Sequence, residues 1–189
     1  MADRRAGLST DGSSAPSTRR WTARRCLPLL GVLLLLTLAG SVAGLLPVQL
    51  MRVDSGSMAP TVSAGDLLLV QRGAGPVGRR DVVVVPHPGT GTLLVKRVVA
   101  VGGDRVGLED GVLVVDGAPV CEPAVDPARQ DGVWFGPVTV PDGDVFLLGD
   151  DRSDSVDSRD FGSVPAADVE GLVHLRAWPH PGRVTADSC

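Results

Sequence analysis

Two serines flank a glycine in the segment Asp54–Thr61, as Ser55-Gly56-Ser57. A serine hydroxyl attacks a carbonyl efficiently only when a base takes its proton, and hydrogen-bond donors must stabilise the oxyanion that develops. A Ser-Gly-Ser turn offers an attacking hydroxyl, a second hydroxyl and a backbone N–H that a substrate can approach because Gly56 has no side chain. The same tripeptide is also common in linkers, so the hypothesis of a nucleophile requires a base elsewhere in the chain.

Lys96 is the candidate for that base. The chain has 18 basic residues, and Lys96 is the one lysine among them. An arginine keeps its proton in proteins, whereas a desolvated lysine loses it readily, so a lone lysine hints at a role for a neutral amine. If this segment is a strand, the side chains that share a face with the lysine are Leu94, Val98 and Ala100, while Arg97 points to the other face.

Burying a charged amine on that apolar face is costly, and the expected response is a lowered pKa for Lys96. A neutral amine is the form that accepts a proton from a serine hydroxyl. The alternative is a lysine that extends its charged end from a strand edge into water. The sequence predicts a general base at this position and leaves that alternative open.

The third polar segment, residues 149–162, contains five aspartates and two arginines. A calcium loop of the EF-hand type needs oxygen ligands at its first, third and fifth positions. A loop starting at Asp150 has Arg152 at the third position, and a loop starting at Asp151 lacks the glycine and the final glutamate. We therefore predict a rigid loop held by Asp–Arg pairs, with some serine hydroxyls directed inward.

Metal ions and other cofactors are not expected. The three histidines are scattered, and no two cysteines are close enough in sequence for a zinc site. Cys121 and Cys189 both follow the apolar segment described next, where a disulfide is permitted, but two cysteines without a spacing motif are equally compatible with free thiols.

The segment Leu27–Leu50 is almost wholly apolar, with Thr37, Ser41 and Gln49 as its polar residues. A helix of this length covers the roughly 30 Å of a bilayer core. A buried core helix would have a polar face, and a cleaved secretory signal would have a shorter apolar region. We predict a single transmembrane anchor helix over residues 26–50.

Charge predicts the orientation of that anchor. The first 25 residues hold six arginines and two acids, whereas the whole chain carries a net charge of −4. Positive flanks remain in the cytoplasm. Residues 1–25 are therefore expected to form a disordered cytoplasmic tail of a cell-membrane protein, residues 51–180 an extracytoplasmic domain, and residues 181–189 a C-terminal tail.

After the anchor, short runs of Val and Leu alternate with Gly, Pro and Asp turns. Asp110-Gly111, Asp116-Gly117 and Asp142-Gly143 are typical hairpin turns. The predicted fold class is mainly β, with one N-terminal transmembrane helix and then an antiparallel, barrel-like domain. The expected strands are residues 67–70, 82–85, 93–101, 105–108, 112–115, 138–140 and 145–148, and residues 121–132 are expected to form an exposed loop.

These segments together resemble the ordered motifs of the type I signal peptidases, in the compact form typical of Gram-positive bacteria. The motifs are Ser-Gly-Ser-Met-Ala-Pro-Thr, Gly65-Asp66, Val95-Lys96-Arg97 with Gly103-Asp104, and the acidic loop of residues 149–162. The resemblance runs from the anchor to about Trp178. One departure is Asp151, where the family usually has asparagine; a carboxylate facing the lysine would favour its charged form.

The resemblance implies a role for each site residue. Ser57 would be the nucleophile and Lys96 the general base, while the Ser57 N–H and the Ser55 hydroxyl would form the oxyanion hole. The supporting residues would be Ser155, which orients the lysine, together with Asp150, Asp157, Arg159 and Arg97.

The implied function is removal of signal peptides, with small residues at the first and third positions before the cut. The expected partners are membrane-bound preproteins and the lipid bilayer, with the translocation machinery as a further candidate. A catalytically inactive, anchored β-domain that binds a partner is the alternative. Self-cleaving repressors of the DNA-damage response share related motifs, but the apolar segment and the acidic domain argue against nucleic acid as a partner.

Overall fold

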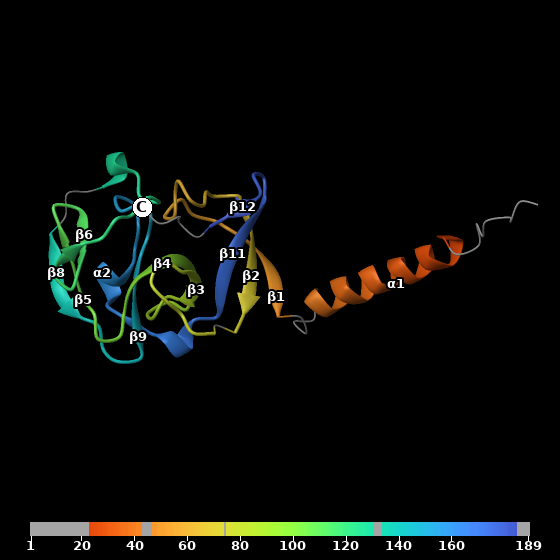
Figure 1. The fold of residues 1–189 in the computed structure, drawn as a ribbon, viewed down its shortest axis with the longest axis horizontal. Helices are drawn as coiled ribbons and strands as arrows, with labels where there is room; N and C mark the ends of the chain where they lie inside the picture. Colours follow the sequence, from red (N-terminus) through yellow and green to blue (C-terminus); the bar gives the residue numbers. More distant parts are fainter. Residues whose placement is uncertain (1–22, 43–46, 74, 131–133, 185–189) are drawn as a thin grey trace, which may run out of the picture. The chain divides into compact units, whose positions relative to one another are not determined.

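The computed structural model describes residues 23–42, 47–73, 75–130 and 134–184. The chain divides into two units, residues 1–39 and residues 40–189, and helix α1 (Ala23–Val42) begins in the first (Figure 1). Most of the predicted cytoplasmic tail, and residues 185–189 with Cys189, lie outside the described residues.

Helix α1 exposes apolar side chains, for example Leu34 at 69% and Leu35 at 66% of their accessible surface. Within the part of the chain that the structure describes, no helix has both the length and the apolar character needed to cross a bilayer.

The predicted helix over residues 26–50 is wrong at its C-terminal end. Residues 48–50 belong to strand β1 (Val48–Arg52), which pairs antiparallel with β2 (Leu67–Arg72). Pro47 precedes β1 and has no N–H to continue a helix, while its carbonyl accepts a hydrogen bond from the Arg72 N–H at 2.7 Å. Pairing with the edge of β2 satisfies the backbone of this segment in a way that an apolar pattern alone does not reveal.

The larger sheet is antiparallel throughout and has the strand order β1-β2-β11-β3-β4-β9-β10, with β12 paired to β11. Among the described strands, β1 and β10 do not pair with each other, so this sheet does not close into a barrel. The remaining strands of the sheet are β3 (Val82–Pro86), β4 (Leu93–Val101), β9 (Asp144–Leu148), β10 (Val164–Pro165), β11 (Gly171–Trp178) and β12 (Gly182–Arg183).

A second, smaller sheet has the order β7-β6-β5-β8 (Figure 1). Two of the predicted turns connect its strands: Asp110 and Gly111 have φ of 51° and 80°, and Asp116 and Gly117 have φ of 54° and 78°. Positive φ at both residues is the geometry of a tight hairpin turn. The strands are β5 (Arg105–Glu109), β6 (Val112–Val115), β7 (Ala118–Pro119) and β8 (Phe135–Thr139).

The mainly β, antiparallel fold is thus confirmed, and most of the predicted strands are present. Strand β11 was not predicted, because His174 and Arg176 interrupt its apolar pattern. Strand β8 begins three residues earlier than predicted. The helical segments of this unit are all short: α2 (Ser158–Phe161) and the 3₁₀ turns η1 (Pro127–Arg129) and η2 (Ala166–Asp168).

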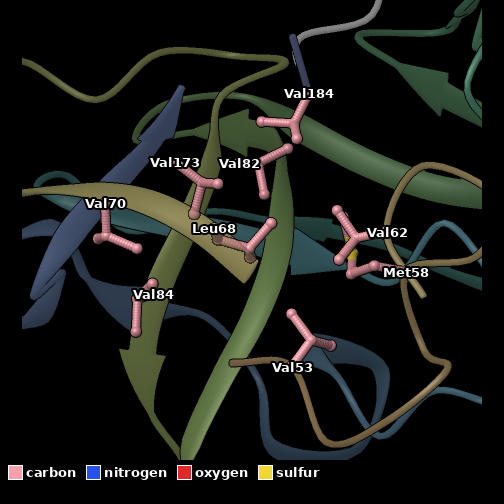
Figure 2. Packing of buried hydrophobic residues seen from close by; sticks show 9 residues of the cluster. All are labelled: Val53, Met58, Val62, Leu68, Val70, Val82, Val84, Val173 and Val184. Atoms are coloured by element: carbon pink, nitrogen blue, oxygen red, sulfur yellow. The ribbon is translucent and has the colours of Figure 1, made fainter. Parts of the chain in front are cut away.

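One hydrophobic cluster fixes the loop that carries the two serines. Val53 precedes Ser55, and Met58 and Val62 follow Ser57; all three are at most 5% exposed. Figure 2 shows these side chains reaching from the loop toward residues of the large sheet, among them Leu68 and Val82. The loop is therefore held by buried anchors on both sides of the exposed Ser55.

Candidate active site

The loop after β1 brings Ser57 next to Lys96 of β4, an interior strand of the large sheet. Its carbonyl accepts a hydrogen bond from the Asp151 N–H at 3.1 Å. Its own N–H has no acceptor among the described residues, and the hydroxyl of Ser55 lies 3.4 Å from that of Ser57. The Ser57 N–H and the Ser55 hydroxyl are therefore two hydrogen-bond donors that this loop offers next to the Ser57 hydroxyl.

Lys96 lies in β4 and is 2% exposed. Its Nζ donates hydrogen bonds to Ser57 Oγ at 2.7 Å and to Ser155 Oγ at 3.0 Å. Across the sheet it is in register with Val83 of β3. The structure thus brings the lysine together with two serine side chains that are 39 and 59 residues away from it in sequence.

The predicted alternation of faces along β4 holds only in part. Leu94 and Val98 pack in one hydrophobic cluster, but Ala100 packs in another, together with Val99. A register shift between Val98 and Ala100, opposite β9, causes the change. The shift follows the lysine, so the faces of Lys96 and Arg97 are those that the sequence predicts.

Burial lowers the pKa of Lys96 from 10.5 to about 8. Loss of hydration is the largest cause, since it disfavours the ammonium form, and the charge of Arg159 acts in the same direction. The carboxylates of Asp157, Asp150 and Asp154 act in the opposite direction. No carboxylate forms an ion pair with Lys96 within the described residues, so burial prevails.

A chain of hydrogen bonds holds the second partner of the lysine. Ser155 Oγ donates to Asp157 Oδ2 at 2.8 Å, and Arg159 Nε donates to Asp157 Oδ1 at 2.9 Å. Asp157 also caps α2 by accepting from the Arg159 N–H. Burial would raise the pKa of Asp157, but hydrogen bonds, first that from Arg159 and then that from the Gly149 N–H, lower it overall.

Gly149 allows the acidic loop to lie directly against Ser57. A Cβ atom at this position would lie 2.3 Å from Ser155 Oγ and 2.5 Å from the Ser57 carbonyl oxygen. Moving either atom would disturb a hydrogen bond, since Ser155 Oγ accepts from Lys96 and Ser57 O accepts from the Asp151 N–H. A glycine is therefore required where the two loops meet.

On the other side of β4, Arg97 and Asp150 form a buried ion pair. Both guanidinium contacts measure 2.7 Å, from Nε to Oδ1 and from the second terminal nitrogen to Oδ2. Thr61 Oγ1 donates to the same carboxylate at 2.5 Å, which links the serine loop to the acidic loop. The Arg97 guanidinium also donates to the carbonyl of Arg80 at 3.0 Å.

Asp151 is buried, and its carboxylate accepts a hydrogen bond from Ser153 Oγ at 2.7 Å. The carboxylates that raise the pKa of Lys96 are those of Asp157, Asp150 and Asp154.

Within the described residues, no group of His, Cys, Asp and Glu side chains is arranged to hold a metal ion.

A groove with a volume of about 370 Å³ lies beside Ser57. One wall is the segment that leads to the serine, including Met51 and Val53, and the other is the start of β4, including Leu93 and Val95. Both walls contribute apolar residues, and Ser55 and Ser57 also line the groove.

The sequence profile of the family described as "Signal peptidase, peptidase S26" matches residues 24–178, which include both serines, the lysine and the acidic loop. The chain belongs to this family. Signal peptidase I of Bacillus caldolyticus is 38% identical over 142 residues, covering 67% of this chain and 78% of that protein. Signal peptidase I of Mycobacterium tuberculosis (strain H37Rv) is 43% identical over 107 residues, 46% of this chain but only 36% of that protein.

Among solved structures, the crystal structure of a signal peptidase I from Enterococcus faecalis V583 is 30% identical with a TM-score of 0.46, covering 53% of this chain and 98% of that chain. The match to the family profile and the similarity to the Bacillus caldolyticus enzyme confirm the resemblance to type I signal peptidases. As a member of the signal peptidase family, the chain is an enzyme of this type.

Several residues of this signal peptidase site were not predicted from the sequence. Thr61, Gly149 and the Asp151 N–H join the two loops, and Glu122 pairs with the buried Arg152. The residues 121–132 are not simply an exposed loop, because Val125 is buried and Glu122 is largely covered. Cys121 forms a disulfide, which the sequence left open.

Proposed function

We propose that this protein is a serine endopeptidase that removes signal peptides, with Ser57 as the nucleophile and the neutral amine of Lys96 as the general base. The observation that carries the proposal is the 2.7 Å hydrogen bond between Lys96 Nζ and Ser57 Oγ, made by a buried amine whose pKa is lowered to about 8. A lysine with that pKa is partly neutral at pH 7 and accepts a proton from the hydroxyl.

In the first step, Lys96 Nζ takes the Ser57 hydroxyl proton while Oγ forms a bond to the scissile carbonyl carbon. The carbonyl oxygen becomes an oxyanion, for which the Ser57 N–H and the Ser55 hydroxyl are the donors on this loop. The Lys96 ammonium then gives its proton to the leaving amine as the peptide bond breaks. A water molecule, activated by the same amine, hydrolyses the acyl-enzyme.

The supporting residues keep the amine in position during these proton transfers. Ser155 accepts a hydrogen bond from Lys96 and donates one to Asp157, so the lone pair of the neutral amine remains free for Ser57. The Asp157–Arg159 and Asp150–Arg97 pairs fix the loop and the strand on which these groups lie.

The substrate, we propose, lies extended in the groove between residues 51–58 and the start of β4. A groove of about 370 Å³ that is shared among several substrate residues leaves room for small side chains next to the nucleophile. This supports a preference for small residues at the first and third positions before the cut, as the resemblance to the family implies.

Membrane association through the N-terminal segment is part of the proposal. It is supported by the apolar sequence of residues 27–46 and by the exposed leucines of α1. Substrates that are themselves membrane-bound would then be presented close to Ser57, with the domain on the extracytoplasmic side. Alkaline carbonate extraction of membranes tests this: release into the supernatant would contradict an inserted anchor.

The decisive experiment incubates the full chain, in detergent, with a preprotein and determines the new N-terminus of the product. Cleavage after a small residue is expected for the parent, and Ser57→Ala is expected to abolish it. The matched control is Ser63→Ala, because Ser63 is an exposed serine on the same loop. Full activity of Ser57→Ala would refute the nucleophile, whereas a folded but inactive parent would favour a binding module.

A further inference from the structure

Among the described residues, Arg152 is the largest fully buried side chain, and it lies in the acidic loop. Its Nε donates to the Gly149 carbonyl at 2.9 Å, and one terminal nitrogen forms an ion pair with Glu122. The other terminal nitrogen is buried and has no partner among the described residues. A buried guanidinium in this state depends strongly on the partners that it does have.

Glu122 is the one carboxylate that pairs with Arg152 in the described part of the chain. It belongs to a different region, the segment that follows β7 of the small sheet. That segment is held to the small sheet by a hydrogen bond from the Val120 N–H to the Leu113 carbonyl at 2.8 Å; within it, Val125 is buried and Cys121 is disulfide-bonded. The carboxylate is thus presented from a well-anchored position.

Hydrogen bonds continue from Arg152 to the catalytic lysine. The carbonyl of Gly149 accepts from Arg152, and the N–H of the same residue donates to Asp157 Oδ2 at 3.0 Å. Asp157 accepts from Ser155 Oγ, which in turn accepts from Lys96 Nζ. In addition, the backbone carbonyl of Arg152 accepts from Arg159 at 2.9 Å.

We propose that Glu122 is a positioning residue for the reaction: through Arg152 it holds the acidic loop, and thereby Ser155, against Lys96. The small sheet then contributes to catalysis although none of its strands carries a residue of the dyad. This inference rests on the proposed Ser57–Lys96 mechanism and assigns a function to the segment between β7 and β8 of the small sheet.

Glu122→Gln removes the charge and keeps the shape of the side chain. We expect kcat on a peptide substrate to fall about three- to thirtyfold with little change in KM, the range found when residues that act through others are altered. We also expect the acidic limb of the pH–rate profile to move to higher pH by about half a unit or more, because a loosened loop hydrates the Lys96 amine.

The direction of that movement distinguishes positioning from charge. Removing a carboxylate without any loosening would leave the pKa of Lys96 unchanged or lower it, since negative charges stabilise the ammonium form. Glu109→Gln is the matched control, because this substitution removes the same charge from an exposed residue of the small sheet. Its kcat and pH profile are expected to equal those of the parent.

The outcomes separate this inference from the mechanism beneath it. A parent whose rate does not depend on pH between 6 and 9 would refute Lys96 as the base. A parent with the expected limb, together with a Glu122→Gln variant of parental kcat and profile but lower melting temperature, would overturn the positioning role and leave the dyad intact.

Two further variants cover the case in which Glu122→Gln does not fold. Glu122→Asp keeps the charge on a shorter stem and is expected to recover part of the lost kcat. The double variant Glu122→Leu with Arg152→Met replaces the whole buried pair by apolar groups, which proteins often tolerate. If that double variant folds and retains parental kcat and pH profile, the proposal is wrong.

Discussion

Lys96 and Arg97 are neighbouring cations on β4, and both are at most 4% exposed, yet their surroundings are opposite. On one face, Lys96 contacts two hydroxyls and no carboxylate within the described residues. On the other face, Arg97 meets the Asp150 carboxylate through two hydrogen bonds of 2.7 Å. Strand β4 therefore buries Lys96 without a counter-ion among the described residues, and Arg97 with the Asp150 carboxylate as its counter-ion.

The difference shows how a fold can lower the pKa of one of two neighbouring cations. A carboxylate in contact stabilises the charged form, so the Arg97–Asp150 pair is a structural link between β4 and the acidic loop. Hydroxyl partners give little compensation for lost hydration, so the pKa of Lys96 falls to about 8. The carboxylate of Asp157 lies near Lys96, but it forms an ion pair with Arg159.

The strongest test of this contrast is Lys96→Arg. An arginine cannot give up its proton in this range of pH, so kcat is expected to fall about 100- to 10,000-fold, as for Lys96→Ala. The measurement is single-turnover cleavage of a peptide substrate, with circular dichroism to verify folding. Arg105→Lys, at an exposed arginine of the small sheet, serves as the control and should be fully active. Substantial activity of Lys96→Arg would refute the base assignment.

The second test removes the counter-ion from the other face. Asp150→Asn leaves the Arg97 guanidinium buried without a carboxylate, and we expect the free energy of unfolding to fall by about 3–5 kcal/mol. Urea denaturation measures it. The control is Asp116→Asn: the side chain of Asp116 is 55% exposed in its pair with Arg79, so the loss should be at most about 1 kcal/mol. Equal losses in the two variants would show that burial does not distinguish these ion pairs.

The third test measures how much the buried, unpaired charge of Lys96 lowers the free energy of unfolding. Its pKa in the folded protein, about 8, lies below the value of 10.5 for a free lysine, so the unfolded chain binds the proton more readily. The folded state therefore loses stability as the pH falls from about 10.5 to about 8, by about 3 kcal/mol in total.

Lys96→Met removes this penalty. At pH 7 the variant is expected to be inactive but more stable than the parent by up to about 3 kcal/mol, and the difference should vanish above pH 10.5, where the lysine is neutral in both states. Urea denaturation at the two pH values measures the change. A parent as stable as the variant at pH 7 would mean that the amine is not desolvated as we describe.

Much of the β domain follows from local sequence patterns. Asp-Gly pairs specify hairpin turns through their backbone conformation, and the Val- and Leu-rich runs between them become strands. The C-terminal end of the apolar N-terminal segment could not be predicted from such local patterns. Val48 and Leu50 fit an apolar helix as well as a strand, and pairing with β2 decided between the two.

The chemical types of the proposed reacting groups can be identified without a structure: a serine next to a glycine, a single lysine in an apolar run, and an acidic loop with arginines. These follow from side-chain chemistry, which does not depend on the fold. The tertiary structure alone decided that Ser57, Lys96 and Ser155 meet, that Asp150 neutralises Arg97 and not Lys96, and that Glu122 reaches Arg152. Contacts between residues so far apart depend on strand register and burial, for which no local pattern in the chain provides a signal.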